Sequence, residues 1–261
     1  MIADQPTLLA LDFDGVVCDG MIEYFQTAWR TYCRIWSSSD SVPPDDLAQK
    51  FYRTRPVIET GWEMPVLVRE LVKGTPEADI LHDWQSIAKQ TITSENLDPK
   101  MLSTQLDGIR DQWISADLPS WLALHRFYPG VIERVKAFLE NSLDLYIITT
   151  KEERFVRSLL EKEGVNLNRG RIFGKGEKRP KYEILRELLA GVQPTPQIWF
   201  VEDRLKTLLK VQQHPDLGDV HLFLADWGYN TQTERDSVSE YPRIQLLSQS
   251  QFTQEFSAWR S

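Results

Sequence analysis

Two aspartates near the N-terminus have the spacing to act on one substrate atom. Asp12 and Asp14 follow the apolar run LLAL (8–11), which predicts a buried strand, and Gly15 follows where the strand must turn. Residues i and i+2 of a strand point the same way, so both carboxylates should face one spot at its carboxyl end. Two acids there repel each other unless a cation lies between them, and Mg²⁺ prefers such oxygen ligands. One carboxylate could also attack phosphorus while the other transfers a proton. An ordinary Asp-Gly turn is the non-catalytic alternative.

Candidate phosphate-binding groups come later in the chain. The predicted strand LDLYIITT (143–150) ends in Thr149 and Thr150, and a hydroxyl there can hold a phosphate oxygen without adding charge. Acids gathered around a phosphate also need a counter-charge, which a lysine supplies as a compact cation. The segment GKGEKRPKYEIL offers Lys178 and Lys181. We prefer Lys178 slightly, and the sequence leaves both open.

A pair of acids ends the next clear strand, QIWFVED (197–203). Glu202 and Asp203 should lie at the same sheet edge as Asp12 and Asp14, because ligands of open α/β sheets bind where the parallel strands end. The carboxylates would then form an oxygen-rich cation site, with Asp203 preferred over Glu202 as a direct ligand.

The segments that position these groups alternate between strand and helix. Strands are predicted at 8–11, 143–150, 171–173, 197–203 and 220–226, with amphipathic helices beginning near 131, 155 and 182. This alternation predicts an α/β fold with a doubly wound, mainly parallel sheet.

Residues 20–127 interrupt that alternation. Helical periodicity recurs there without a convincing strand, at 21–36, 45–53, 63–73, 76–93, 98–114 and 118–125. We therefore expect a core domain of residues 1–19 and 128–261, with residues 20–127 as an all-helical cap inserted after the first strand.

One loop of the expected cap could reach the substrate. In RTRPVIETGWE (53–63), Pro56 and Gly61 shape a bend between helices, and loops on rigid scaffolds often carry binding residues. Arg55 could bind an anionic leaving group. Pairing of Arg55 with Glu59 or Glu63 is the structural alternative.

Composition limits the class of partner. The 261 residues are 41% apolar and 26% charged, as in a soluble globular protein, and the net charge of −8 argues against nucleic acid or an anionic membrane as the main partner. Cys18 and Cys33 make no disulfide framework, which fits a reducing compartment. The N-terminus lacks the features of a signal peptide, and no apolar run approaches the ~18 residues of a membrane helix. We expect a cytoplasmic protein of unspecified oligomeric state.

The polar groups occur as four ordered motifs that resemble those of the haloacid dehalogenase (HAD) superfamily. LLALDFDGVVCD (8–19) is similar to the first motif, DxDG(T/V)(L/V)xD, with Asp19 as a trailing acid. Thr149 takes the position of the second-motif hydroxyl, and Lys178 or Lys181 that of the third-motif lysine. Glu202 and Asp203 match an acidic-pair fourth motif, although the further Asp that often follows is missing in RLKT (204–207). FVEDRLKTL and DWGYN also resemble a little-characterised plant and cyanobacterial branch of the superfamily.

The resemblance implies a Rossmann-like core and a Mg²⁺-dependent phosphatase acting on a small phosphorylated metabolite. Asp12 would attack phosphorus to form an aspartyl-phosphate, and Asp14 would act as acid and then base. The hydroxyl and the lysine would hold phosphoryl oxygens, and the metal would lie among Asp12, the backbone carbonyl of Asp14 and the Glu202/Asp203 pair. Gly15, Thr150 and Arg55 are assigned to substrate binding. A phosphomutase and a catalytically idle binding or regulatory protein are the alternatives.

Overall fold

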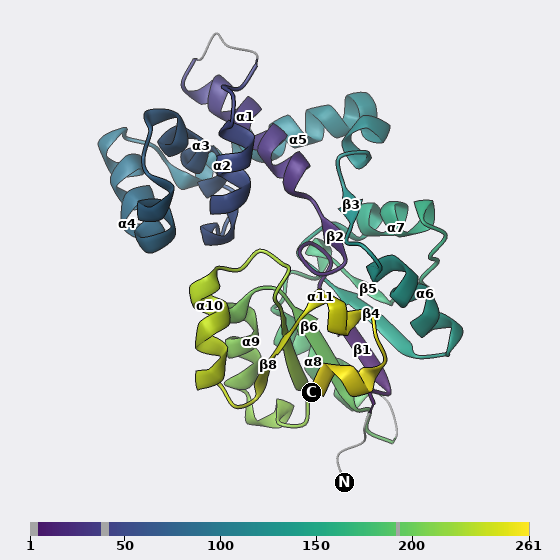
Figure 1. Ribbon diagram of the computed structural model, residues 1–261. Coiled ribbons are helices and arrows are strands. Elements are labelled where there is room, and N and C mark those ends of the chain that lie inside the picture. Colours follow the sequence, from purple (N-terminus) through teal and green to yellow (C-terminus); the bar gives the residue numbers. More distant parts are fainter. Residues whose placement is uncertain (1–4, 38–41, 192–193, 261) are drawn as a thin grey trace. The chain divides into compact units, whose positions relative to one another are not determined.

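The chain divides into two compact units (Figure 1). The computed structural model describes residues 5–37, 42–191 and 194–260. A core unit holds the residues up to Asp19 and those from Arg126 on, and a helical unit spans Gly20–His125. The second junction lies two residues earlier than the sequence predicts, because Arg126–Phe127 (β3) pairs antiparallel with Cys18–Asp19 (β2).

A parallel six-stranded sheet forms the centre of the core unit, in the order β5-β4-β1-β6-β7-β8. The strands are β1 Leu8–Leu11, β4 Asp144–Ile148, β5 Ile172–Phe173, β6 Ile198–Glu202, β7 His221–Ala225 and β8 Ile244–Leu247. The predicted α/β fold is confirmed. The sequence analysis missed β8, an edge strand with the sequence IQLL, in which Gln245 interrupts the apolar residues.

Side chains alternate between the two faces of this sheet. Leu8 and Phe200 belong to an apolar cluster that includes Leu185 of α8 (Lys181–Ala190) and Leu208 of α9 (Leu205–Gln212). On the other face Trp199 packs against Trp259, with ring centroids 5.6 Å apart. Helices therefore cover both faces. They are α6 Val131–Glu140, α7 Glu153–Lys162, η2 Lys175–Glu177, α8 Lys181–Ala190, α9 Leu205–Gln212, η3 Pro215–Leu217, α10 Gln232–Ser237, η4 Val238–Glu240, α11 Gln249–Phe252 and η5 Phe256–Arg260.

The helical unit contains helices and no strand among its described residues. They are α1 Met21–Ile35, α2 Leu47–Thr54, η1 Arg55–Val57, α3 Glu63–Lys73, α4 Glu77–Ser94 and α5 Pro99–Leu122. The two helices predicted at 98–114 and 118–125 run together as α5, with non-helical dihedrals at Asp117, shortly before Pro119. In the described part of the chain, no helix combines the length and apolar character needed to cross a membrane.

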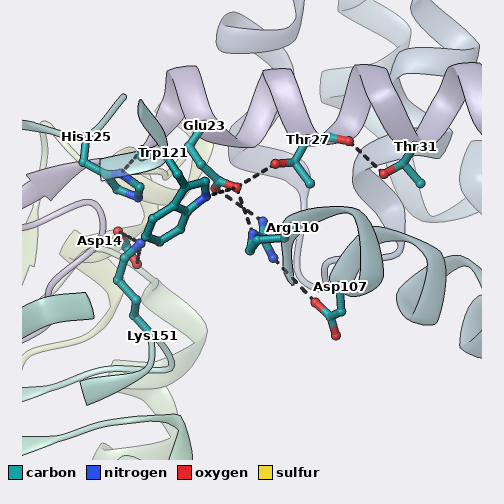
Figure 2. A network of polar contacts seen from close by, with 9 residues as sticks. All are labelled: Asp14, Glu23, Thr27, Thr31, Asp107, Arg110, Trp121, His125 and Lys151. Carbon is teal, nitrogen blue, oxygen red and sulfur yellow. Dashed lines mark hydrogen bonds and ion pairs between the residues drawn. The ribbon is translucent and has the colours of Figure 1, made fainter. Parts of the chain in front are cut away.

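A buried carboxylate ties α1 to α5 (Figure 2). Glu23 is fully buried and accepts hydrogen bonds from Thr27 Oγ1 (2.7 Å), Arg110 Nε (2.8 Å) and Trp121 Nε1 (3.1 Å). Arg110 and Trp121 lie on opposite sides of the break at Asp117, so one carboxylate holds both halves of α5. Such bonds offset the cost of burying an ion pair.

Candidate active site

Three carboxylates meet where β1 and β6 end. Asp12 follows β1, and its backbone N–H donates to Val201 O of β6 (2.9 Å). Glu202 ends β6 and Asp203 follows it. The three residues are buried, and one carboxylate oxygen from each lies within 4.8 Å of the others. Because β1 and β6 are parallel neighbours, their carboxyl ends share one edge and bring these predicted residues together.

Lys181 supplies the positive charge in this cluster. It is the first residue of α8, and its Nζ lies 2.8 Å from Asp12 Oδ1 and 2.7 Å from Glu202 Oε2. Burial alone would lower the pKa of Lys181, but the two carboxylates outweigh burial and raise that pKa above its usual value. The ammonium therefore stays charged beside Asp12.

Lys178, the slightly preferred lysine of the sequence analysis, lies elsewhere. It is exposed and follows η2 with a left-handed φ of 53°. Together with Glu152 and Glu177 it lines a separate depression of about 340 Å³. The structure thus brings Lys181, and not Lys178, to Asp12.

The electrostatics of the cluster suit a divalent cation. Burial raises the pKa of Asp12 to about 7, opposed by Lys181 and reinforced by Glu202 and Asp14. Burial and the neighbouring Glu202 and Asp12 also raise the pKa of Asp203 well above its usual value. When ionised, three carboxylates around one ammonium carry surplus negative charge in a buried place, and carboxylate oxygens are the donors that Mg²⁺ prefers. The residues present therefore fit the expected metal.

Gly15 makes room for Asp203. Its φ is +91°, and a Cβ on this residue would lie 2.2 Å from Asp203 Oδ2. A side chain at this position would displace the carboxylate, which explains why a glycine follows Asp14. A substrate contact by Gly15 is not needed to account for it.

Asp14 pairs with a lysine that the sequence analysis did not select. Lys151 Nζ lies 3.1 Å and 3.3 Å from the two Asp14 carboxylate oxygens, and both side chains are largely buried (Figure 2). Lys151 comes shortly after β4, the other parallel neighbour of β1. The sequence could have indicated Lys151 by its position two residues after Thr149, in the segment TTK that ends a predicted strand.

Thr149 and Thr150 differ in burial. Thr149 directly follows β4 and is buried, and its Oγ1 accepts the backbone N–H of Lys151 (3.2 Å). Thr150 is exposed. The structure therefore places Thr149, rather than Thr150, inside the sheet edge that carries Asp14 and Lys151.

Arg55 belongs to the helical unit. Its Nη1 donates to Ile58 O (3.3 Å), and its guanidinium lies 5.0 Å from the centre of the Tyr24 ring. Glu63, one of the two acids considered as its partner, accepts hydrogen bonds from Glu59 N (2.9 Å), Thr60 Oγ1 (2.9 Å) and Trp84 Nε1 (3.0 Å). The loop is thus closed by Glu63, and Arg55 helps to shape it.

Buried acids at the ends of parallel strands, with a lysine of α8 beside them, give this α/β protein a charged site at its sheet edge. Solved structures share this fold over nearly the whole chain. A hydrolase of the haloacid dehalogenase-like family from Streptococcus pneumoniae matches with a TM-score of 0.56 at 15% identity, covering 93% of this chain and 94% of that one. A predicted phosphoglycolate phosphatase from Haemophilus somnus gives 0.56 at 14% identity (98% and 97%). A predicted phosphatase from Clostridium acetobutylicum gives 0.56 at 10% identity (94% and 95%).

The chain therefore has the haloacid dehalogenase-like fold, as the motif resemblance led us to expect. No protein-family model and no curated protein matches the sequence. At these identities the likeness concerns the fold, and the chemistry must be argued from the residues themselves.

Proposed function

We propose that the protein is a Mg²⁺-dependent phosphatase that hydrolyses a small phosphate monoester through an aspartyl-phosphate. The observation that carries this proposal is the ion pair of Lys181 with Asp12 inside a buried carboxylate cluster at a strand end. A carboxylate kept beside an ammonium can remain ionised in a buried place, as a nucleophile must. Phosphatases among the proteins that share the fold support phosphoryl chemistry.

In the first half-reaction the Asp12 carboxylate attacks phosphorus. A bond forms between an Asp12 oxygen and phosphorus, and the bond from phosphorus to the leaving oxygen breaks with its electron pair on that oxygen. Asp14 acts as the general acid of this step and gives a proton to the leaving oxygen. The products are the free alcohol and a phosphorylated Asp12.

The second half-reaction restores the enzyme. Asp14, now ionised, accepts a proton from water as the water oxygen attacks phosphorus. The bond between phosphorus and Asp12 breaks, which releases inorganic phosphate and returns the Asp12 carboxylate. Lys151, 3.1 Å from Asp14, orients this acid in both steps, and the Thr149 hydroxyl donates to a phosphoryl oxygen.

The metal would be held by Asp12, Asp203 and the backbone carbonyl of Asp14. Glu202 is already engaged, because its Oε2 accepts from Lys181 and its Oε1 from Arg204 N (3.0 Å). We therefore assign Glu202 to holding Lys181 in place. When bound, Mg²⁺ supplies charge neutralisation at the phosphoryl oxygens.

Substrate recognition beyond the phosphate is proposed on sequence grounds. Arg55 would contact an anionic leaving group, and Thr150 and Gly15 would border the phosphate. The sequence contains two cysteines, Cys18 and Cys33, too few for a disulfide framework, which supports the proposed cytoplasmic location.

Hydrolysis of p-nitrophenyl phosphate tests the proposal. The wild type should release p-nitrophenol with Mg²⁺ and lose activity with EDTA, and Asp12→Asn should be inactive while keeping its circular dichroism spectrum. Activity of Asp12→Asn within about tenfold of wild type, ~1.4 kcal/mol in the barrier, would remove Asp12 as nucleophile. Failure of the folded wild type on this ester and on a panel of phosphorylated metabolites would favour the idle binding protein. Transfer of phosphate between metabolites without its release would favour the mutase.

A further inference from the structure

The segment DWGYN (226–230), which directly follows β7, packs against Asp203 and has no role in the mechanism above. The backbone N–H of Tyr229 donates to Asp203 Oδ2 (2.7 Å). A Cβ on Gly228 would lie 2.3 Å from Asp203 Cβ and 2.5 Å from Gly15 O, so a larger residue there would push Asp203 away. The segment thus fixes both the position of Asp203 and one oxygen of its carboxylate.

Asn230 anchors this segment to the sheet. Its Nδ2 donates to Asp203 O (2.9 Å) and Ala225 O (2.7 Å), and its Oδ1 accepts from Arg235 Nη1 (2.8 Å). The side chain is almost completely buried, and its two donors and its acceptor oxygen are used within the protein. Because Ala225 ends β7 and Asp203 follows β6, one amide joins the ends of two neighbouring strands.

The same segment is attached to the turn that carries Asp14. Trp227 Nε1 donates to Val16 O (3.1 Å), and the Tyr229 hydroxyl donates to Asp19 Oδ1 (2.9 Å). The segment therefore connects the chain after β1 with the chain after β6, the two places that supply the carboxylates.

We propose that Asn230 is a positioning residue of the cation site. It acts through Asp203: the amide holds the strand ends together, and the Tyr229 N–H then keeps the Asp203 carboxylate turned within the cluster. The resembled motif often has a further acid where this chain has RLKT (204–207), which contains none. Here the hydrogen bonds that fix Asp203 come from residues 226–230 instead. This inference rests on the metal-binding part of the proposed function.

Metal affinity measured without substrate tests the inference. Mn²⁺, a paramagnetic substitute for Mg²⁺, is titrated into chelator-treated protein and followed by electron paramagnetic resonance. Asn230→Ala should raise the Kd for Mn²⁺ by about 10- to 100-fold, as removal of a group that orients a ligand typically does. The activity of this variant should recover at saturating Mg²⁺, so that the Mg²⁺ requirement rises more than kcat falls. Asn141→Ala is the matched control, because the exposed Asn141 amide also donates to a backbone carbonyl, that of Ala137 (2.9 Å).

The outcomes separate a positioning role from a purely structural one. A Kd within twofold of wild type together with a lowered Tm would show that Asn230 only stabilises the fold, and would overturn the inference. If Asn230→Ala does not fold, Asn230→Asp is measured in its place. It keeps the size and the Arg235 contact but replaces the donor with an acceptor, and it should weaken Mn²⁺ binding equally.

The same data separate this inference from the proposed function. One possible result is that the wild type binds Mn²⁺ and hydrolyses no ester, while Asn230→Ala binds Mn²⁺ more weakly. This result would contradict the proposed phosphatase and leave the inference standing. Wild-type protein that hydrolyses esters but binds no Mn²⁺ would overturn the inference.

Discussion

Lys181→Met removes the ammonium from the carboxylate cluster while keeping most of the side-chain volume. At an effective dielectric constant of about 20, a charge 2.8 Å from another contributes roughly 6 kcal/mol of gross attraction, and Lys181 makes two such contacts. Much of this is offset by the desolvation of the buried groups. Breaking a buried ion pair from one side typically costs about 3–5 kcal/mol, and we expect a loss of unfolding free energy in that range.

Lys181→Met should lower catalytic activity by more than its loss of stability alone explains. Without the ammonium, the pKa of Asp12 should rise further above its usual range, so less of the nucleophile is ionised at neutral pH. The acidic limb of the kcat/KM profile should therefore move to higher pH. Loss of an electrostatic group at the reacting centre typically lowers kcat by about 10²–10³-fold.

Lys178→Met is the matched control, three residues earlier in the same segment. Its side chain is exposed, so its stability should change by less than about 0.5 kcal/mol and its activity should stay near that of wild type. Both variants are compared by urea unfolding and by hydrolysis of p-nitrophenyl phosphate at saturating Mg²⁺ over a range of pH. A larger loss for Lys178→Met, or small and equal losses for both, would refute the assignment of Lys181.

In chelator-treated protein, the unfolding free energy should fall as pH rises from about 4 to about 7. Folded Asp12 keeps its proton up to a pKa of about 7, whereas the unfolded carboxyl, with a pKa of 3.8, has already lost it. In Asp12→Asn, the unfolding free energy measured by urea titration should depend less steeply on pH. An unchanged dependence on pH would contradict Asp12 as its origin. Arg110→Ala should destabilise the protein by about 3–5 kcal/mol in calorimetry because the buried Glu23 carboxylate loses the Arg110 guanidinium. Arg53→Ala, which breaks an exposed pair, should have little effect, and similar losses in both would argue against the Glu23 network. Arg55→Ala should lower kcat/KM for the natural substrate but not for p-nitrophenyl phosphate, whereas equal losses with a lower Tm would assign this arginine to loop structure.

Local patterns were sufficient to predict most of the sheet and the acids at its edge. An apolar run such as LLAL or IWFV is long enough for a buried strand, and the acids that follow it must lie where the strand ends. The i, i+2 spacing of Asp12 and Asp14 is likewise a property of the local backbone. The edge strand β8 was missed because Gln245 interrupts its apolar residues and leaves too short an apolar run for this reasoning.

Contacts between distant segments were decided by the tertiary structure. β1 lies between β4 and β6, and this strand order brings Lys151 to Asp14 across 137 positions of sequence and Glu202 to Asp12. The choice between Lys178 and Lys181 depends on where α8 begins and on the left-handed residue before it, which composition does not reveal. The hydrogen bond from the Asn230 amide to the Asp203 carbonyl forms because β6 and β7 end side by side. Sequence determines which residues end a strand, whereas strand order determines which of those residues meet, because pairing is set by packing of the whole sheet rather than by any one segment.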